Sequence, residues 1–287
     1  MVHPDSIPRA EFAVIGGSGT FSISFPEDLE QAGIQVIATG LVFTTPFGES
    51  PSFKLFKLDE KKVLTVRMHG WRSGVSRASA SQQVFWVLRE AGIKKVIAEG
   101  GVGSINRLLR PGDLLVPSDY LDFSMRKDVG LGGEYLLTMR RPVCPLIKRE
   151  LVAAAEKSVE PGRRVFNCGV YAVTDGRHFE SPAEVAMLGR LGADIVGQSM
   201  CPEVYLAREI GACYGRLDIV SNYAEGVVRE WDHRLLKDIF YNEAIKSAKI
   251  ILKALSHLDP SQVCGCPNLR LDTLLRDKTE KEEIVED

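Results

Sequence analysis

Short β-rich runs alternate with helical periodicities along the whole chain, and this alternation constrains the fold more than any other feature. Strands that alternate with helices favour an α/β domain over a β-sandwich or a helix bundle. The expected strands are Phe12–Ile15, Val36–Thr39, Val63–Arg67, Val96–Ala98, Asp113–Val116, Val165–Tyr171, Ile195–Val196 and Arg216–Val220. The clearest helices are Ala78–Ala91, Ser181–Leu191, Pro202–Ile210 and Trp231–Leu258.

The chain shows no sequence sign of a domain boundary. No internal repeat or low-complexity linker interrupts it, so we expect a single domain over residues 1–275. The last segment, residues 276–287, is rich in charge and is expected to be a solvated tail. Ser181, Pro182 and Glu184 predict a capping box with a first-turn proline at the start of one helix.

Composition and charge narrow the class of partner. The 287 residues carry 36 basic and 38 acidic side chains, and the net charge of -2 gives no bulk attraction to nucleic acid or to an anionic membrane. The N-terminal sequence lacks a basic segment followed by an apolar stretch, and no apolar run is long enough to span a bilayer. We therefore expect a cytoplasmic protein whose partner is a small molecule or another protein.

Six cysteines are scattered along the chain, and most are expected to be reduced packing residues. Only Cys264 and Cys266 stand close in sequence, with no histidine or second cysteine pair beside them at a metal-site spacing, so zinc is not expected. The interpretations left open for this pair are two thiols in a surface turn before Pro267, or a redox-active or stabilising disulfide.

A glycine-rich turn follows the first predicted strand, where the run EFAVI breaks into GGSG at residues 16–19. A dinucleotide fingerprint would need glycine at Ser22, and Pro26 disfavours the helix that such a fingerprint opens. Gln31 and Gln35 occupy the region where its acidic residue would stand, which disfavours a nicotinamide-dependent dehydrogenase. Two interpretations stay open: a nest of backbone N–H groups for a small oxyanion, or a tight turn between strands.

Three further predicted strand ends carry polar or glycine-rich groups. Arg67 and His69 stand two residues apart, so on an extended chain they would share a face and could bind an anion. Residues 100–103 are glycine-rich, and Ser199 stands just ahead of a helix that opens near Pro202. Each of these has an ordinary structural alternative, as a surface residue, a turn or a helix cap.

In combination, these motifs resemble the purine nucleoside phosphorylase family, in its trimeric branch, and particularly its 5'-methylthioadenosine phosphorylase members. The likeness covers most of the chain, from about Phe12 to Leu258. It is carried by VIGGSG at 14–19, TTPFGESPS at 44–52, GGVGSINRLLRPGDLLVPSDYLD at 100–122, GADIVGQSMCPEVYLAREIG at 192–211, and Asn222. The implied fold is a single α/β domain whose central mixed, twisted and partly barrel-like sheet is flanked by helices.

The resemblance also implies a reaction. Members of the family cleave a purine nucleoside with inorganic phosphate and release the base and a pentose 1-phosphate, as in purine salvage. Neither a cofactor nor a metal is implied, because phosphate itself is the co-substrate. The residues that match the family's phosphate site are Ser18, Arg67, His69, Gly101 and Ser199.

The resemblance assigns the base and sugar site to residues that only partly follow the family pattern. Asn222 stands where the methylthioadenosine members usually have aspartate, and Ala224 replaces a second aspartate. An amide can donate to a 6-oxo group, and Glu180 after Phe179 can accept from a purine N1–H, so we expect a preference for 6-oxopurines. The competing outcome is that methylthioadenosine remains the substrate. Gln198 puts an amide where methionine is usual.

Several alternatives remain open at this point. Glu99, Gly100 and Gly101 stand where the methylthioadenosine members often carry threonines, so a protein that binds its ligand without turnover, or turns it over weakly, is the second hypothesis. His233 could hold a 5'-hydroxyl or cap the last helix. The resemblance implies a homotrimer in which residues 119–126 reach the neighbouring subunit's sugar pocket.

Overall fold

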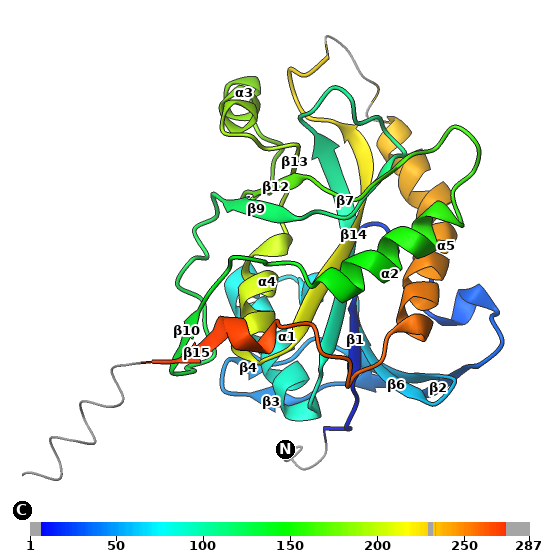
Figure 1. Cartoon of the computed structure of the whole chain (residues 1–287), viewed down its shortest axis with the longest axis vertical. Helices are drawn as coiled ribbons and strands as arrows, with labels where there is room; N and C mark the ends of the chain where they lie inside the picture. Colours follow the sequence, from blue (N-terminus) through cyan, green and yellow to red (C-terminus); the bar gives the residue numbers. More distant parts are fainter. Residues whose placement is uncertain (1–6, 229–231, 233, 274–287) are drawn as a thin grey trace, which may run out of the picture.

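The computed structural model describes residues 7–228, 232 and 234–273, and these form an α/β fold around one large mixed sheet (Figure 1). The strands of this sheet are β1 (Phe12–Ile15), β2 (Ile34–Leu41), β5 (Phe53–Leu58), β6 (Lys61–Val66), β7 (Lys95–Ser104), β8 (Leu114–Leu115), β9 (Asp119–Asp122), β11 (Val165–Phe166), β12 (Val170–Val173), β13 (Ile195–Gly197) and β14 (Cys213–Tyr223). The helices are α1 (Arg77–Ala91), α2 (Pro145–Glu156), α3 (Pro182–Arg190), α4 (Met200–Glu209) and α5 (Arg234–His257), with short 3₁₀ turns η2 (Glu27–Leu29), η3 (Met68–Gly70) and η4 (Pro267–Leu269).

The centre of the sheet is parallel. β1 pairs in parallel with both β6 and β7, and β7 pairs in parallel with β14. β13 joins β7 in the antiparallel direction and leads to β12 and β9. Because the carboxyl ends of parallel strands meet at the same edge, the segments that leave β1, β6, β7 and β14 are brought together there.

The two faces of the sheet are covered by different helices. In β1, Ala13 and Ile15 pack into one apolar cluster with residues of α1 and α4, whereas Phe12 and Val14 pack into another with residues of α2 and α5. Figure 1 shows α2 and α5 beside each other along β14. A short strand with four buried residues therefore separates two halves of the core, which explains its continuous apolar sequence.

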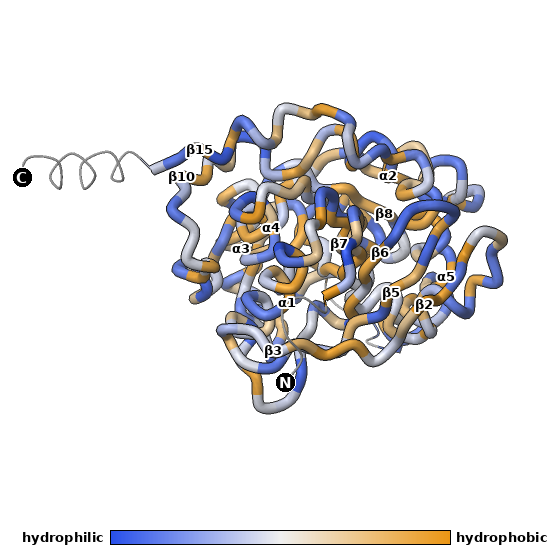
Figure 2. Tube along the Cα trace, turned by 90° about the horizontal axis from the view of Figure 1, so that it is seen from below, coloured by the Kyte–Doolittle hydropathy of each residue, from blue (hydrophilic) through white to orange (hydrophobic). Residues whose placement is uncertain are grey.

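Two short strand pairs lie outside the large sheet. These are β3 (Thr44–Thr45) with β4 (Gly48–Glu49), and β10 (Tyr135–Leu137) with β15 (Arg270–Asp272). Figures 1 and 2 show the β10–β15 pair at one side of the molecule. None of the helices in the described part of the chain combines the length and apolar character that a membrane crossing requires.

The predicted fold class is confirmed, and the differences are local. All expected strands are present, although Val165–Tyr171 is divided into β11 and the beginning of β12. The capping box is present, with the Ser181 side chain accepting from the Glu184 N–H and the Glu184 side chain accepting from the Ser181 N–H. Helix α2, strands β5 and β9 of the large sheet and the two short strand pairs were missed. The expected tail, residues 276–287, lies outside the described residues.

The cysteine expectation was wrong in one respect. Cys144 and Cys213 lie beside Cys264 and Cys266 in space, although more than forty residues separate each of them from that pair in sequence. Cys266 is also buried, not part of an exposed turn, whereas Cys264 is half-buried. Sequence spacing alone did not reveal this contact, because it is made by the packing of α2 and β14 against the loop after α5.

Candidate active site

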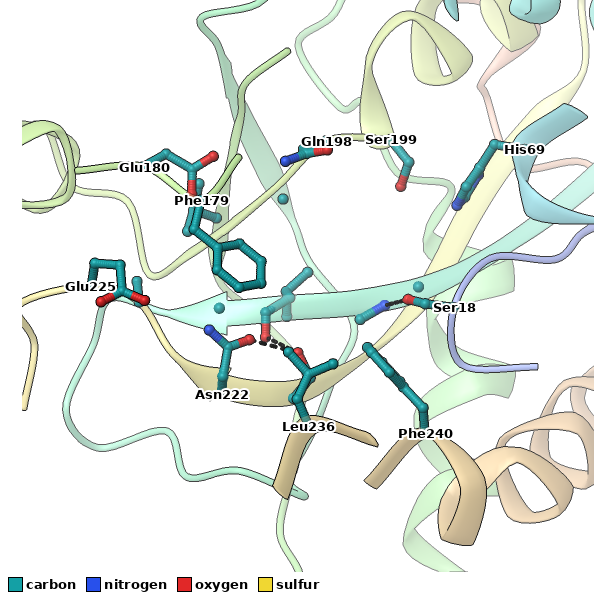
Figure 3. A pocket seen from close by; sticks show the side chains of 18 of the residues that line it. Ser18, His69, Phe179, Glu180, Gln198, Ser199, Asn222, Glu225, Leu236 and Phe240 are labelled. Carbon is teal, nitrogen blue, oxygen red and sulfur yellow. Dashed lines mark hydrogen bonds between the residues drawn. The ribbon is translucent and has the colours of Figure 1, made fainter. Parts of the chain in front are cut away.

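One pocket gathers most of the residues that the sequence singled out. It lies where β7, β13 and β14 end, and α5 forms one of its walls (Figure 3). The predicted site residues that line it are Ser18, His69, Gly101, Phe179, Glu180, Gln198, Ser199 and Asn222. Two others are not placed there: Arg67 lines a different hollow, and His233 lies outside the described residues.

The pocket has a polar end that contains Ser18, His69 and Ser199 (Figure 3). The Ser18 hydroxyl accepts from the Gly101 N–H at 2.8 Å, which ties the glycine turn after β1 to β7. His69 Nδ1 lies 2.7 Å from Glu203 Oε1, and both side chains are buried. Since a carboxylate only accepts, this contact places a proton on Nδ1 and orients the ring.

A buried histidine at this position depends on a local backbone irregularity. Met68 and His69 have positive φ angles of 49° and 55°, in a 3₁₀ turn that follows β6. The turn brings His69 Nε2 against Gly17, where an added Cβ would stand 2.5 Å from that nitrogen and 2.4 Å from the Glu99 carbonyl oxygen. Gly17 is thus required by close packing.

The same turn corrects the expectation for Arg67. On an extended chain Arg67 and His69 would share a face, but the backbone reverses between them. The Arg67 guanidinium donates to the Phe21 carbonyl and stacks over the Phe21 ring, with 4.5 Å between its Cζ and the ring centroid. The structure therefore does not bring Arg67 together with Ser18 and Ser199 around the candidate pocket.

Glu99 holds the glycine turn with a carboxylate of the protein itself. Its Oε1 accepts from the Gly17 N–H, from the Thr20 N–H at 3.1 Å and from the Thr20 hydroxyl at 2.7 Å. Burial raises the pKa of Glu99, while the hydrogen bonds from Thr20 and Gly17 and the charge of His69 act in the opposite direction. Of the two interpretations left open for this turn, the structure shows backbone N–H groups directed at an anion, but that anion is an internal carboxylate.

A fully buried ion pair lies behind the polar end. Arg216 Nη2 lies 2.5 Å from Asp218 Oδ1, and Arg216 Nε lies 2.8 Å from Asp218 Oδ2. The same Nη2 donates to the Ser199 hydroxyl at 3.2 Å. Because Ser199 accepts from Arg216, its own O–H is left as a donor. Burial raises the pKa of Asp218, and the adjacent Arg216 opposes this shift.

The other end of the pocket contains Asn222, Phe179, Glu180 and Glu225 (Figure 3). A bulge in the pairing of β14 with β7 precedes Asn222 and changes the direction of its side chain. Asn222 Oδ1 accepts from the Ser221 hydroxyl at 2.7 Å, and its Nδ2 donates to the Tyr223 carbonyl at 2.9 Å. Both hydrogen bonds restrict the orientation of the amide.

Glu180 and Gln198 are held by neighbours on this side of the pocket. Glu180 Oε1 accepts from the Thr174 hydroxyl at 2.5 Å. Gln198 Oε1 accepts from Arg77 at 2.8 Å, and the Arg77 Cζ stacks 4.0 Å from the centroid of the Trp71 ring. The amide that looked out of place in the sequence therefore belongs to a polar and aromatic cluster at the pocket wall.

Sequence reasoning missed several lining residues. Leu236 and Phe240 stand four apart on α5 and line the pocket, although their helical spacing indicated only core packing. Glu225 also lines it, one residue after the alanine that replaces the family's second aspartate. The sequence did contain a signal for the Arg216–Asp218 pair, because two charged residues stand inside an apolar strand. Charged residues at such positions are rarely buried without a specific partner.

Comparisons with known proteins identify the family of the chain. The sequence profile of the phosphorylase superfamily matches residues 11–256, so the chain belongs to that superfamily. A probable S-methyl-5'-thioinosine phosphorylase of Methanothermobacter thermautotrophicus is 32% identical over 217 residues, which cover 75% of this chain and 72% of that one. The 6-oxopurine nucleoside phosphorylase of Pyrococcus furiosus is 29% identical over 272 residues, covering 91% and 97%. The family resemblance predicted from the motifs is confirmed.

The solved structures support the fold. A methylthioadenosine phosphorylase from Schistosoma mansoni in complex with adenine superposes with a TM-score of 0.73 over 90% of this chain and 96% of that chain, at 21% identity. At this identity the likeness is one of architecture. The residues around the pocket must therefore be interpreted from their own contacts.

The buried pair Arg216–Asp218 yields a stability prediction. Asp218→Asn leaves the guanidinium without its charged partner in a dry interior, and we expect it to lower the free energy of unfolding by about 3–5 kcal/mol. The double variant Arg216→Met/Asp218→Leu removes both charges and is expected to regain most of that loss. Urea unfolding followed by circular dichroism measures both, and a loss below about 1 kcal/mol in Asp218→Asn would contradict the assignment.

Proposed function

We propose that this protein cleaves the glycosidic bond of a purine nucleoside with inorganic phosphate, releasing the base and a pentose 1-phosphate. The observation that carries the proposal is a single pocket with hydroxyl and imidazole groups at one end and an oriented amide with a carboxylate at the other. The relatives named as S-methyl-5'-thioinosine and 6-oxopurine nucleoside phosphorylases support it. A cytoplasmic location and a role in purine salvage belong to the same proposal.

The proposed reaction needs few reactive groups. A phosphate oxygen attacks C1' of the sugar as the bond from C1' to N9 breaks, and the bonding electrons leave with the purine. Ser18, His69 and Ser199 would position the phosphate, while Asn222 would stabilise the developing charge on the purine through a hydrogen bond at N7. An amide cannot supply a proton, so in this proposal solvent protonates the departing base.

A second candidate function is binding without efficient turnover. The observation that favours it is the Glu99 carboxylate, which already accepts from the Gly17 and Thr20 N–H groups of the glycine turn. Arg67 is also directed to Phe21, away from the pocket. A protein with this arrangement would bind a purine nucleoside while offering phosphate a weakened site.

Base release from a panel of nucleosides distinguishes these functions and tests the base preference. We expect phosphate-dependent release from inosine, guanosine and methylthioinosine to be faster than from methylthioadenosine, because Asn222 can donate to a 6-oxo group and Glu180 can accept from N1–H. Nucleoside binding without release at any phosphate concentration would instead support the second candidate.

The variant Asn222→Asp should shift the ratio of rates toward methylthioadenosine, on the order of tenfold, since a carboxylate suits the 6-amino group. Asn242→Asp makes the same chemical change at an exposed position of α5 and should leave the ratio unchanged. Equal or faster cleavage of methylthioadenosine than of inosine and methylthioinosine by the wild-type protein would refute the base preference.

The internal carboxylate generates a prediction about phosphate. Glu99→Gln keeps an acceptor for Thr20 but removes a negative charge beside the glycine turn, so we expect KM for phosphate to fall on the order of tenfold. KM for the nucleoside should change little, because Glu99 does not line the pocket. Initial rates over a phosphate series provide the measurement, with Glu49→Gln on exposed β4 as the control. An unchanged KM for phosphate would show that Glu99 does not oppose the anion.

We also propose that the protein forms a trimer, and an exposed apolar surface after β9 supports this proposal. Phe123 and Met125 follow β9 and are 42% and 87% exposed. We expect Phe123→Asp/Met125→Asp to dissociate a trimer into monomers and to lower base release at least tenfold, because this segment is proposed to complete a neighbouring pocket. Sedimentation velocity measures the oligomeric state. Ile37→Asp, at another exposed apolar residue on β2, is the control. A monomeric wild-type protein at micromolar concentration would rule the proposal out.

A further inference from the structure

Four cysteine thiols meet at a place remote from the candidate pocket. Cys144 is the N-cap of α2, Cys213 is the first residue of β14, and Cys264 and Cys266 belong to the loop between α5 and η4. Their four sulfur atoms all lie within 4.8 Å of one another, and the Sγ atoms of Cys213 and Cys264 are 3.2 Å apart. We call these four residues the cysteine cluster.

The geometry suits one metal ion with four sulfur ligands. Zinc binds thiolates tetrahedrally at about 2.3 Å, which places ligand sulfurs about 3.8 Å apart. The 3.2 Å contact and the 4.8 Å upper limit on the separations in the cysteine cluster are compatible with that value. We propose that the cysteine cluster binds one Zn²⁺ ion as a closed structural site. A tetrahedral set of four soft sulfur ligands selects zinc over calcium or magnesium, which prefer oxygen.

The surroundings of the cysteine cluster favour negative charge. Four thiolates and one Zn²⁺ ion carry a net charge of -2, and such a group needs positive charge nearby when it is buried. Lys95 pairs with Cys213 across the β7–β14 register, and its Nζ donates to the Gln262 carbonyl at 3.5 Å. Arg208 donates to the Cys266 carbonyl at 2.8 Å. Both side chains are almost completely buried, at 2% and 4% exposure.

The position of Cys144 adds a second electrostatic contribution. As the N-cap of α2 it lies at the positive end of a twelve-residue helix, where a thiolate is stabilised over a thiol. Three of the four cysteines are buried and Cys264 is half-buried, so the site is shielded but reachable from solvent on one side.

The cysteine cluster connects parts of the chain that are far apart in sequence. It joins the start of α2 and the start of β14 to the loop that leads from α5 into η4 and β15. A zinc ion there would fix the C-terminal loop against the sheet, in addition to the hydrogen bonds from Lys95 and Arg208. Its loss should therefore lower stability without removing any group of the candidate pocket.

Metal analysis of the full chain tests the proposal. The protein is produced in zinc-supplemented medium, purified under reducing conditions without chelator, and analysed by inductively coupled plasma mass spectrometry. We expect about one zinc ion per chain. The double variant Cys264→Ser/Cys266→Ser should contain less than a tenth of that amount, whereas Cys168→Ser, at an exposed cysteine outside the cluster, should retain all of it.

Cobalt reports the ligand set even if the double variant fails to fold. Wild-type protein stripped of zinc and reloaded with Co²⁺ should show sulfur-to-cobalt charge-transfer bands and the intense visible bands of tetrahedral coordination. Absence of both zinc and these bands would overturn the proposal. A disulfide within the cysteine cluster of the metal-free, as-purified protein, detected by alkylation and mass analysis, would also overturn it. Equal zinc contents in the wild type and the double serine variant would do the same.

Discussion

The parallel pairing of β1 with β6 and β7, and of β7 with β14, is the constraint on which the site depends. In this register Ile15 lies opposite Val66 and Ala98, and Ala98 lies opposite Arg216. The next residue of β7 is Glu99, so its carboxylate reaches the glycine turn at the point where β1 ends. The register of the parallel strands thus fixes the position along the sheet of both the glycine turn and the carboxylate that accepts its hydrogen bonds.

Two buried pairs of ionisable side chains lie behind the polar end of the pocket. His69 contacts Glu203, Glu203 also accepts from the Tyr214 hydroxyl at 2.9 Å, and Arg216 is paired with Asp218. Burying such groups costs desolvation energy that their mutual attraction only partly returns, so they contribute little net stability. Their effect is positional, because each fixes the direction of a donor at the polar end of the pocket. The imidazole of His69 and the hydroxyl of Ser199 are oriented before any ligand binds.

The sequence predicted the strand ends well and the contacts between them less well. Ser18, Gly101, Ser199 and Asn222 were found because glycine, serine and asparagine after an apolar run are visible locally. The expectation that Arg67 shares a face with His69 was wrong because the backbone reverses at Met68 and His69. Tertiary packing sets this reversal, and neither methionine nor histidine indicates a positive φ in a sequence. The partners of Glu99 lie 79 to 82 residues away in sequence, and Cys213 lies 51 residues from Cys264, so no spacing rule could reveal these contacts.

The affinity of the polar end for an anion depends on the charge of the Glu99 carboxylate behind the glycine turn. A unit charge about 4 Å from another costs about 4 kcal/mol at an effective dielectric constant of about 20, and each 1.4 kcal/mol is a factor of about ten in affinity. An external anion beside Glu99 must offset such a cost with His69, Ser18 and Ser199, since Arg67 is committed to Phe21. Neutralising Glu99 would remove this cost while keeping an acceptor for Gly17 and Thr20, and the burial that raises the pKa of Glu99 favours its protonation. Phosphate affinity in this protein should therefore depend on the protonation state of a side chain that never touches the nucleoside.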